Sequence, residues 1–136
     1  MIRSLLLCMF LLPLALAGCT SARLENPPPM AIRAGLSTAQ VEASIDQAIR
    51  DANRRSAWAG GMWAVESREP GKQILGLRVR QHYLQLTIQY DDKQFSSRIT
   101  GSRNLDQDDD SIHRKALAWQ RRLEADIYRQ LYLQNP

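Results

Sequence analysis

The sequence has 136 residues, of which 44% are apolar and 24% are charged, and its formal net charge is +4. A chain of this length has room for one domain of ordinary size, which excludes a second hydrophobic core. A net charge this small gives no indication of nucleic-acid binding. Both cysteines, Cys8 and Cys19, lie near the amino terminus. The rest of the chain therefore folds without an internal disulfide and is held by packing alone.

Residues 1–18 have the composition of a secretory signal peptide. Arg3 supplies a positive charge, and an apolar run from Leu5 to Leu16 follows it. This run is shorter than the about 20 apolar residues that a membrane-spanning helix needs. The sequence therefore predicts that residues 1–18 are a leader that is removed on export.

The segment Leu16-Ala17-Gly18-Cys19 resembles the lipobox of bacterial lipoproteins, and it directly follows the leader. The resemblance implies that the Cys19 thiol takes a diacylglycerol, a reaction suited to a thiolate nucleophile, and that fatty acids such as palmitate are then attached. Two or more acyl chains anchor a protein stably to a membrane. The alternative is an ordinary signal peptide cleaved after Ala17, with the thiol left free.

Thr20 follows the cysteine, at the position where an Asp commonly signals retention in the inner membrane. The same resemblance therefore implies the outer membrane, with the protein on the inner leaflet and facing the periplasm. An exported protein rarely meets nucleic acid, so the expected partners are the membrane itself, an envelope protein or an anionic envelope polymer.

Residues 19–36 show no hydrophobic period, and they contain Pro27-Pro28-Pro29. A run of prolines favours an extended stretch without internal hydrogen bonds, so we expect a Pro-rich tether between the lipidated cysteine and the folded part. The alternative is an N-terminal arm that docks on the domain through Met30 and Ile32.

An amphipathic helix is predicted from about residue 38, capped by Ser37 or Thr38 and followed by cations at Arg54 and Arg55. Its apolar positions recur at helical spacing on one face. They are Val41, Ile45, Ala48, Ile49 and Ala52.

Three or four strands are predicted next, beginning with residues 62–67 and a turn at Glu69-Pro70-Gly71. Alternating apolar residues then place Leu75, Leu77 and Val79 on one face of a strand, and Leu84, Leu86 and Ile88 on one face of the next. A turn at Gln81-His82 would pair these residues as Val79 with Leu84, Leu77 with Leu86 and Leu75 with Ile88. A second turn, at residues 91–93, would set Tyr90 opposite Phe95 and Leu86 opposite Ile99.

The last predicted element is a helix that begins at the acidic run Asp108-Asp109-Asp110. Its apolar stripe needs a partner surface, which the apolar sheet face provides. The predicted fold is therefore an α+β two-layer sandwich of order α-β-β-β(β)-α, with both helices on one face of an antiparallel sheet and a single domain over residues 37–134. The stripe consists of Ile112, Ala116, Trp119, Leu123, Ile127 and Leu131.

Three short motifs, Arg80-x-His82, Ser102-x-Asn104-Leu105 and Ile112-His113, are similar to those of a group of small, uncharacterised lipoproteins from Gram-negative bacteria. The likeness covers roughly residues 38–133. The chain departs from the group at Lys115-Ala116-Leu117, where an aromatic residue and an asparagine are expected. The resemblance implies an envelope lipoprotein and brings no activity with it.

The candidate binding residues are Arg78 and Arg80, which the strand alternation places on the polar sheet face. Arg98 and Arg103 extend the same basic surface, which is suited to an acidic partner; the alternative is a solvated face that only keeps the sheet soluble. Trp58 is a second candidate contact, or else a packed lid over the helix.

No catalytic or metal-binding constellation is predicted, and no cofactor. His82 and His113 have no partners at a recognisable spacing, and Asp106 to Asp110 lack the glycine and the terminal glutamate of a calcium loop. We therefore expect a non-enzymatic binding or structural module. The alternative is an accessory subunit or a small hydrolase with an unrecognised active site.

Overall fold

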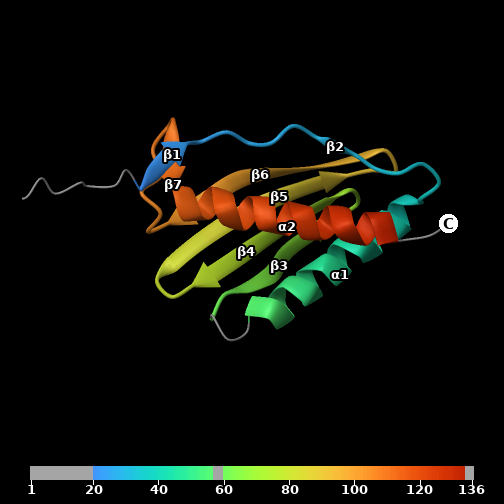
Figure 1. The fold of residues 1–136 in the computed structure, drawn as a ribbon, viewed down its shortest axis with the longest axis horizontal. Helices are drawn as coiled ribbons and strands as arrows, with labels where there is room; N and C mark the ends of the chain where they lie inside the picture. Colours follow the sequence, from blue (N-terminus) through green and yellow to red (C-terminus); the bar gives the residue numbers. More distant parts are fainter. Residues whose placement is uncertain (1–19, 57–59, 134–136) are drawn as a thin grey trace, which may run out of the picture.

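Figure 1 shows a computed structural model of the chain, which describes residues 20–56 and 60–133. Two long helices lie side by side across one face of a five-stranded antiparallel sheet, and a second, two-stranded sheet lies at one end. The predicted α+β fold, with its N- and C-terminal helices on one face, is confirmed. The leader, Cys19 and Trp58 lie outside the described residues.

Helix α1 spans Thr38–Ser56 and begins with a reciprocal cap. The backbone N–H of Gln40 donates to the Ser37 hydroxyl at 3.2 Å, and the Ser37 N–H donates to the Gln40 side-chain oxygen at 2.8 Å. This arrangement satisfies two of the backbone donors that a helix start leaves free. All five predicted apolar positions of the helix are buried.

Strands β3, Met62–Glu69, and β4, Lys72–Val79, form the first hairpin. Its turn lies at Pro70 and Gly71, as predicted, and Gly71 has a φ of 73°. Proline followed by a residue with positive φ is the pattern of a type II turn, which glycine adopts without strain. A bulge between Val65 and Ser67 shifts the register and displaces Glu66 from the regular ladder.

Strand β5, His82–Tyr90, pairs with β4, but the predicted register is wrong by two residues. Leu77 lies opposite Leu84, Leu75 lies opposite Leu86, and Val79 pairs with His82, so the turn is at Arg80-Gln81. A shift of two residues keeps every side chain on its face, which is why the apolar pattern did not distinguish the two registers. Arg80 takes a φ of 54° at the first position of this turn.

Strand β6, Gln94–Arg103, follows a turn in which the Asp91 carboxylate accepts hydrogen bonds from the backbone of Lys93 at 2.7 Å and Gln94 at 2.9 Å. The predicted pairs Tyr90 with Phe95 and Leu86 with Ile99 are both confirmed. A bulge opposite Gln85 and Leu86 then shifts the rest of the ladder by one residue.

The predicted start of the last helix is wrong, because residues 108–113 are not helical. Ser111–His113 is a short strand, β7, and helix α2 spans Arg114–Leu133. Ile112 was predicted to lie in the helix, but it lies in β7 and its side chain is fully buried there. Trp119 is only half-buried, whereas Gln120 and Leu123 are buried, so the face of α2 that packs on the sheet is centred on these two residues and not on Trp119.

Residues 20–36, which we call the N-terminal arm, were predicted as a free tether, and that prediction is wrong for the described part. Strand β1, Ser21–Arg23, pairs with β7, and strand β2, Met30–Ala31, pairs with β6 and completes the sheet in the order β2-β6-β5-β4-β3. Figure 1 shows the arm running along the length of the domain beside α2. The alternative of a docked arm is therefore the correct one. Leu36, at the end of the arm, is itself a buried core residue, and four partly buried arm residues pack against the core, namely Ala22, Leu24, Met30 and Ile32.

Candidate functional site

The sheet face opposite the helices carries a row of three side chains across three strands. Tyr83 of β5 lies opposite Arg78 of β4 and opposite Arg103 of β6. The two guanidinium carbons lie 5.1 Å and 4.9 Å from the centroid of the tyrosine ring, within the range of cation–π contacts. The observed strand register creates this row, because the predicted register would have placed Gln85 opposite Arg78.

Glu66 lies over this row from the bulge in β3. Its carboxylate accepts hydrogen bonds from the Tyr83 hydroxyl, at 2.7 and 2.8 Å, and from the Gln85 amide at 3.1 Å. A side chain at Gly76 would leave no room for it, because a Cβ there would lie 2.1 Å from a Glu66 carboxylate oxygen. The glycine therefore provides the space in which the carboxylate reaches the tyrosine.

The pKa values of the two groups move in opposite directions. The hydrogen bond from Tyr83 is the largest cause that holds the pKa of Glu66 below its ordinary value, and Arg78 and Arg103 add to the effect. Partial burial, followed by the hydrogen bond to Glu66, raises the pKa of Tyr83. A carboxylate made less basic and a phenol made less acidic are poor proton carriers near neutral pH. The cluster is thus better suited to holding charge than to acid–base catalysis.

At the end of this row lies a shallow pocket of about 210 Å³, which we call the basic pocket. Three arginines line it, and none of them forms an ion pair among the described residues. Its charged groups are therefore available to an external anion. The pocket is lined by Arg78, Arg80, Gln81, His82, Tyr83, Arg103 and Asn104.

Asn104 fixes the shape of the basic pocket. Its side-chain amide donates to the carbonyl of Gln81 at 2.7 Å, and its own carbonyl lies 2.6 Å from Nδ1 of His82. Because a carbonyl oxygen only accepts, Nδ1 of His82 carries the hydrogen in this contact. Asn104 has a φ of 56°, a conformation that asparagine tolerates better than most residues. The β4–β5 turn is thereby tied to the end of β6.

The three motifs singled out in the sequence meet at this end of the molecule. Arg80 and His82 contribute to the pocket, and so does Asn104 of the second motif. Leu105 is buried beneath, and its carbonyl accepts from the backbone N–H of His113 at 2.8 Å. The motifs therefore form one structural unit, although they are far apart in the chain.

Arg78 lies on the outer face of β4, as predicted, whereas Arg80 lies in the β4–β5 turn and not in a strand. Both side chains are exposed and both line the basic pocket. Arg103 joins them, whereas Arg98 lies opposite Thr87, away from the pocket. Glu66 was missed, because the bulge that turns it toward Tyr83 leaves no signal in the strand pattern.

Two further structural findings bear on function. Within residues 20–56 and 60–133, no group of three or more His, Cys, Asp or Glu side chains is placed to hold a metal ion. In the same part of the chain, no helix has the length and apolar character needed to cross a membrane.

Comparisons of the chain with protein-family models, with curated proteins and with solved structures find no significant match.

Proposed function

We propose that the protein is an envelope lipoprotein, anchored by lipid on Cys19, whose folded domain binds an anionic partner in the basic pocket. The anchor rests on the sequence, in which the basic and apolar leader ends at Leu16-Ala17-Gly18-Cys19. The outer membrane is the proposed location, since Thr20 follows the cysteine. The binding role rests on the geometry of the sheet face.

The observation that carries the binding role is the convergence of Arg78, Arg80 and Arg103 on one pocket, without an ion pair to any described carboxylate. Glu66, on the same face, accepts hydrogen bonds from Tyr83 and Gln85 and forms no ion pair with the arginines, although the charges of Arg78 and Arg103 help to lower its pKa. Three guanidinium groups around a shallow depression favour carboxylate or phosphate groups, with which arginine makes paired, charge-assisted hydrogen bonds. An acidic segment of an envelope protein and an anionic envelope polymer both offer such groups.

The test is site-specific photocrosslinking in intact cells, with the crosslinker at Gln81, an exposed residue on the rim of the basic pocket. We expect one or a few crosslinked products from the wild-type protein. The yield should fall strongly in the double variant Arg78→Ser/Arg80→Ser and should also fall when salt is added to isolated envelopes. The free energy of unfolding of this double variant should differ from that of the wild type by no more than about 1 kcal/mol, because both side chains are exposed.

A matched control is Arg50→Ser/Arg121→Ser, which removes the same two positive charges from exposed positions outside the pocket. This control should crosslink like the wild type. If the Arg78→Ser/Arg80→Ser variant gives the same products in the same yield, the basic pocket does not bind the partner and the face is merely solvated.

A further inference from the structure

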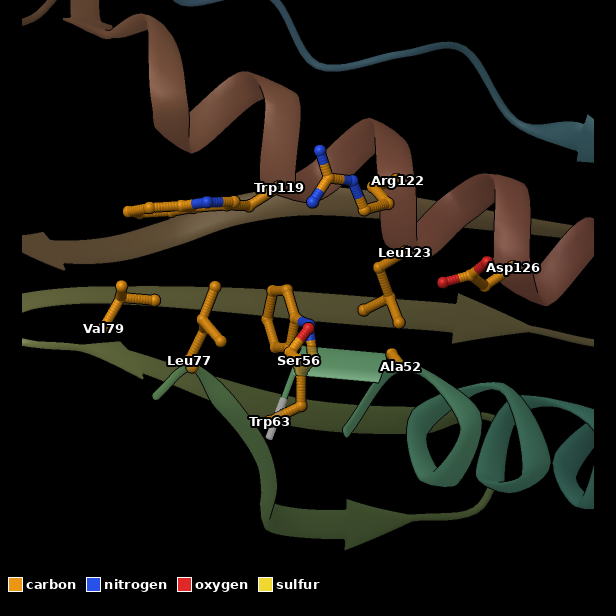
Figure 2. Close-up of a pocket in the computed structure, with 10 residues that line it drawn as sticks. Ala52, Ser56, Trp63, Leu77, Val79, Trp119, Arg122, Leu123 and Asp126 are labelled. Atoms are coloured by element: carbon orange, nitrogen blue, oxygen red, sulfur yellow. The ribbon is translucent and has the colours of Figure 1, made fainter. Parts of the chain in front are cut away.

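A second cavity, which we call the apolar pocket, lies between the helix layer and the sheet, where the end of α1, the middle of α2 and strands β3 and β4 meet. Figure 2 shows the indole of Trp63 and the side chains of Leu77 and Leu123 at its base, with Trp119 and Arg122 at its rim. The cavity has a volume of about 100 Å³. It is distinct from the basic pocket, although the rings of Trp119 and His82 lie side by side with their centroids 6.4 Å apart.

The base of the apolar pocket is held in place by the fold. Trp63, Leu77 and Leu123 are buried members of the core. The backbone of Trp63 is also clamped by Asn53 of α1, whose side-chain oxygen accepts from the Trp63 N–H at 2.7 Å and whose amide donates to its carbonyl at 2.9 Å. The apolar surface of the pocket is therefore formed without a ligand, so that a bound group would not have to order it.

The rim of the apolar pocket carries a positive charge. Asp126 lines the pocket, but its carboxylate is paired with Arg55 of α1 and, at 3.5 Å, with Arg129. Arg122 forms no ion pair among the described residues, and Figure 2 shows its guanidinium turned away from Asp126 and toward Trp119. Arg55 and Arg129, which neutralise Asp126, do not line the pocket, so Arg122 is the cation at its rim that is available to bind an anion.

We propose that the apolar pocket binds a small carboxylic acid with an apolar tail, the tail lying between Trp63, Leu77 and Leu123 and the carboxylate on Arg122. An apolar cavity of about 150 Å³ accommodates benzene, so the present volume corresponds to a tail of about four or five carbon atoms. Arginine binds a carboxylate through two parallel hydrogen bonds, which supplies the charge part of the recognition. This site is independent of the anionic partner proposed for the basic pocket.

The test is a titration of the full chain with straight-chain carboxylates, followed by NMR of the indole N–H groups and the backbone. Hexanoate should shift the Trp63 and Trp119 indole signals at saturable concentrations. From butyrate to hexanoate the affinity should rise by up to about fourfold for each methylene buried, and it should level off for longer chains because the pocket is then full.

Two variants separate the charge from the cavity. Arg122→Gln should weaken hexanoate binding about five- to tenfold and leave hexanol binding unchanged, because the alcohol has no charge to pair. Its matched control, Arg121→Gln, removes the same charge from an exposed neighbour that does not line the pocket and should bind both compounds like the wild type. Ala52→Leu, which fills the cavity from α1, should abolish binding of both compounds.

Three results would overturn the proposal. One is the absence of saturable indole shifts with any of the carboxylates. Another is equal hexanoate affinity in Arg122→Gln and in the wild type, which would remove the carboxylate from Arg122. The third is a set of hexanoate shifts confined to Arg80 and Arg103, which would place the anion in the basic pocket instead.

Discussion

Asn26 is the residue on which the docking of the N-terminal arm can be tested most directly. Its side-chain oxygen accepts a hydrogen bond from the backbone N–H of Ile99 at 2.8 Å and a weaker one from the Gln120 amide at 3.4 Å. Ile99 lies in β6 and is buried, and Gln120 is buried in α2. Asn26 therefore joins the arm to both layers of the domain at one point.

Asn26→Ala leaves the N–H of Ile99 without this partner, and a buried donor that loses its acceptor costs about 1 to 3 kcal/mol. For a urea m-value of about 1 to 3 kcal/mol/M, the unfolding midpoint should fall by roughly 1 M. Hydrogen exchange should also quicken at Leu24 and Ile32, whose backbone N–H groups bond to Asp110 and Lys93 across the arm contact.

The matched control for this variant is Glu25→Ala, one residue earlier in the arm. Glu25 is exposed, and its ion pair is with Arg23, which is exposed as well, so its removal should change stability by no more than about 0.5 kcal/mol. An unchanged midpoint and unchanged exchange in Asn26→Ala would refute the reasoning, because they would show that the arm is not held at this residue.

Three other predictions concern Cys19, Glu124 and Glu66. Cys19→Ala should abolish incorporation of a clickable fatty acid and processing after Gly18; equal label in both proteins would contradict lipidation. Burial raises the pKa of Glu124 above its ordinary value of 4.5, so the ionised carboxylate destabilises the folded state as the pH rises above that value. In urea titrations, Glu124→Gln should therefore be more stable than the wild type at pH 7, and the difference in the free energy of unfolding should disappear toward pH 4. Gly76→Ala should push Glu66 away from Tyr83 and raise the pKa of Glu66 toward its ordinary value, measured by NMR titration; an unchanged pKa would mean that the glycine is not what admits the carboxylate.

The architecture could be predicted from the sequence because it depends mainly on which face of each element is apolar. Leu75, Leu77, Leu84, Leu86 and Ile88 all point into the core, as the alternation required. The strand register cannot be predicted in the same way, because two pairings that differ by two residues bury the same side chains. The turn residues decide it, and at Arg80 the chain adopts a positive φ without the glycine or asparagine that would have signalled it.

The arm and β7 could not be predicted for a different reason. Strand β1 of the arm and β7 are only three residues long, too short to show a periodic pattern. They form by pairing with each other, for example Ala22 with Ile112. Ile112 also lies four residues before Ala116, which is the spacing of a helix face, so the strand was hidden inside the helix stripe. In the arm, the three prolines favour a free extended segment, whereas Met30 and Ile32 favour a docked one, and both of these apolar residues do pack against the core.

The site was partly predictable on the same grounds. Alternation alone places Arg78 on the outer face, but its neighbours across the sheet depend on register and bulges, which the pattern does not reveal. The sandwich of Tyr83 between Arg78 and Arg103 follows from the observed register, and the position of Glu66 follows from the bulge in β3. The polar face is thus predictable as a surface, and the arrangement of charges within it is not.

The docked arm also determines where the basic pocket lies relative to the proposed anchor. Thr20 accepts a hydrogen bond from the backbone N–H of Arg114 at 2.8 Å, and the adjoining His113 bonds to Leu105, the neighbour of Asn104 in the pocket. Figure 1 shows β1, β7 and the β4–β5 turn at the same end of the domain. Cys19 precedes Thr20 directly, and one residue spans at most about 3.6 Å. If Cys19 carries the lipid, the end of the domain that bears the basic pocket is also the end from which the anchor leaves, and we expect the partner of the pocket to lie near the membrane surface.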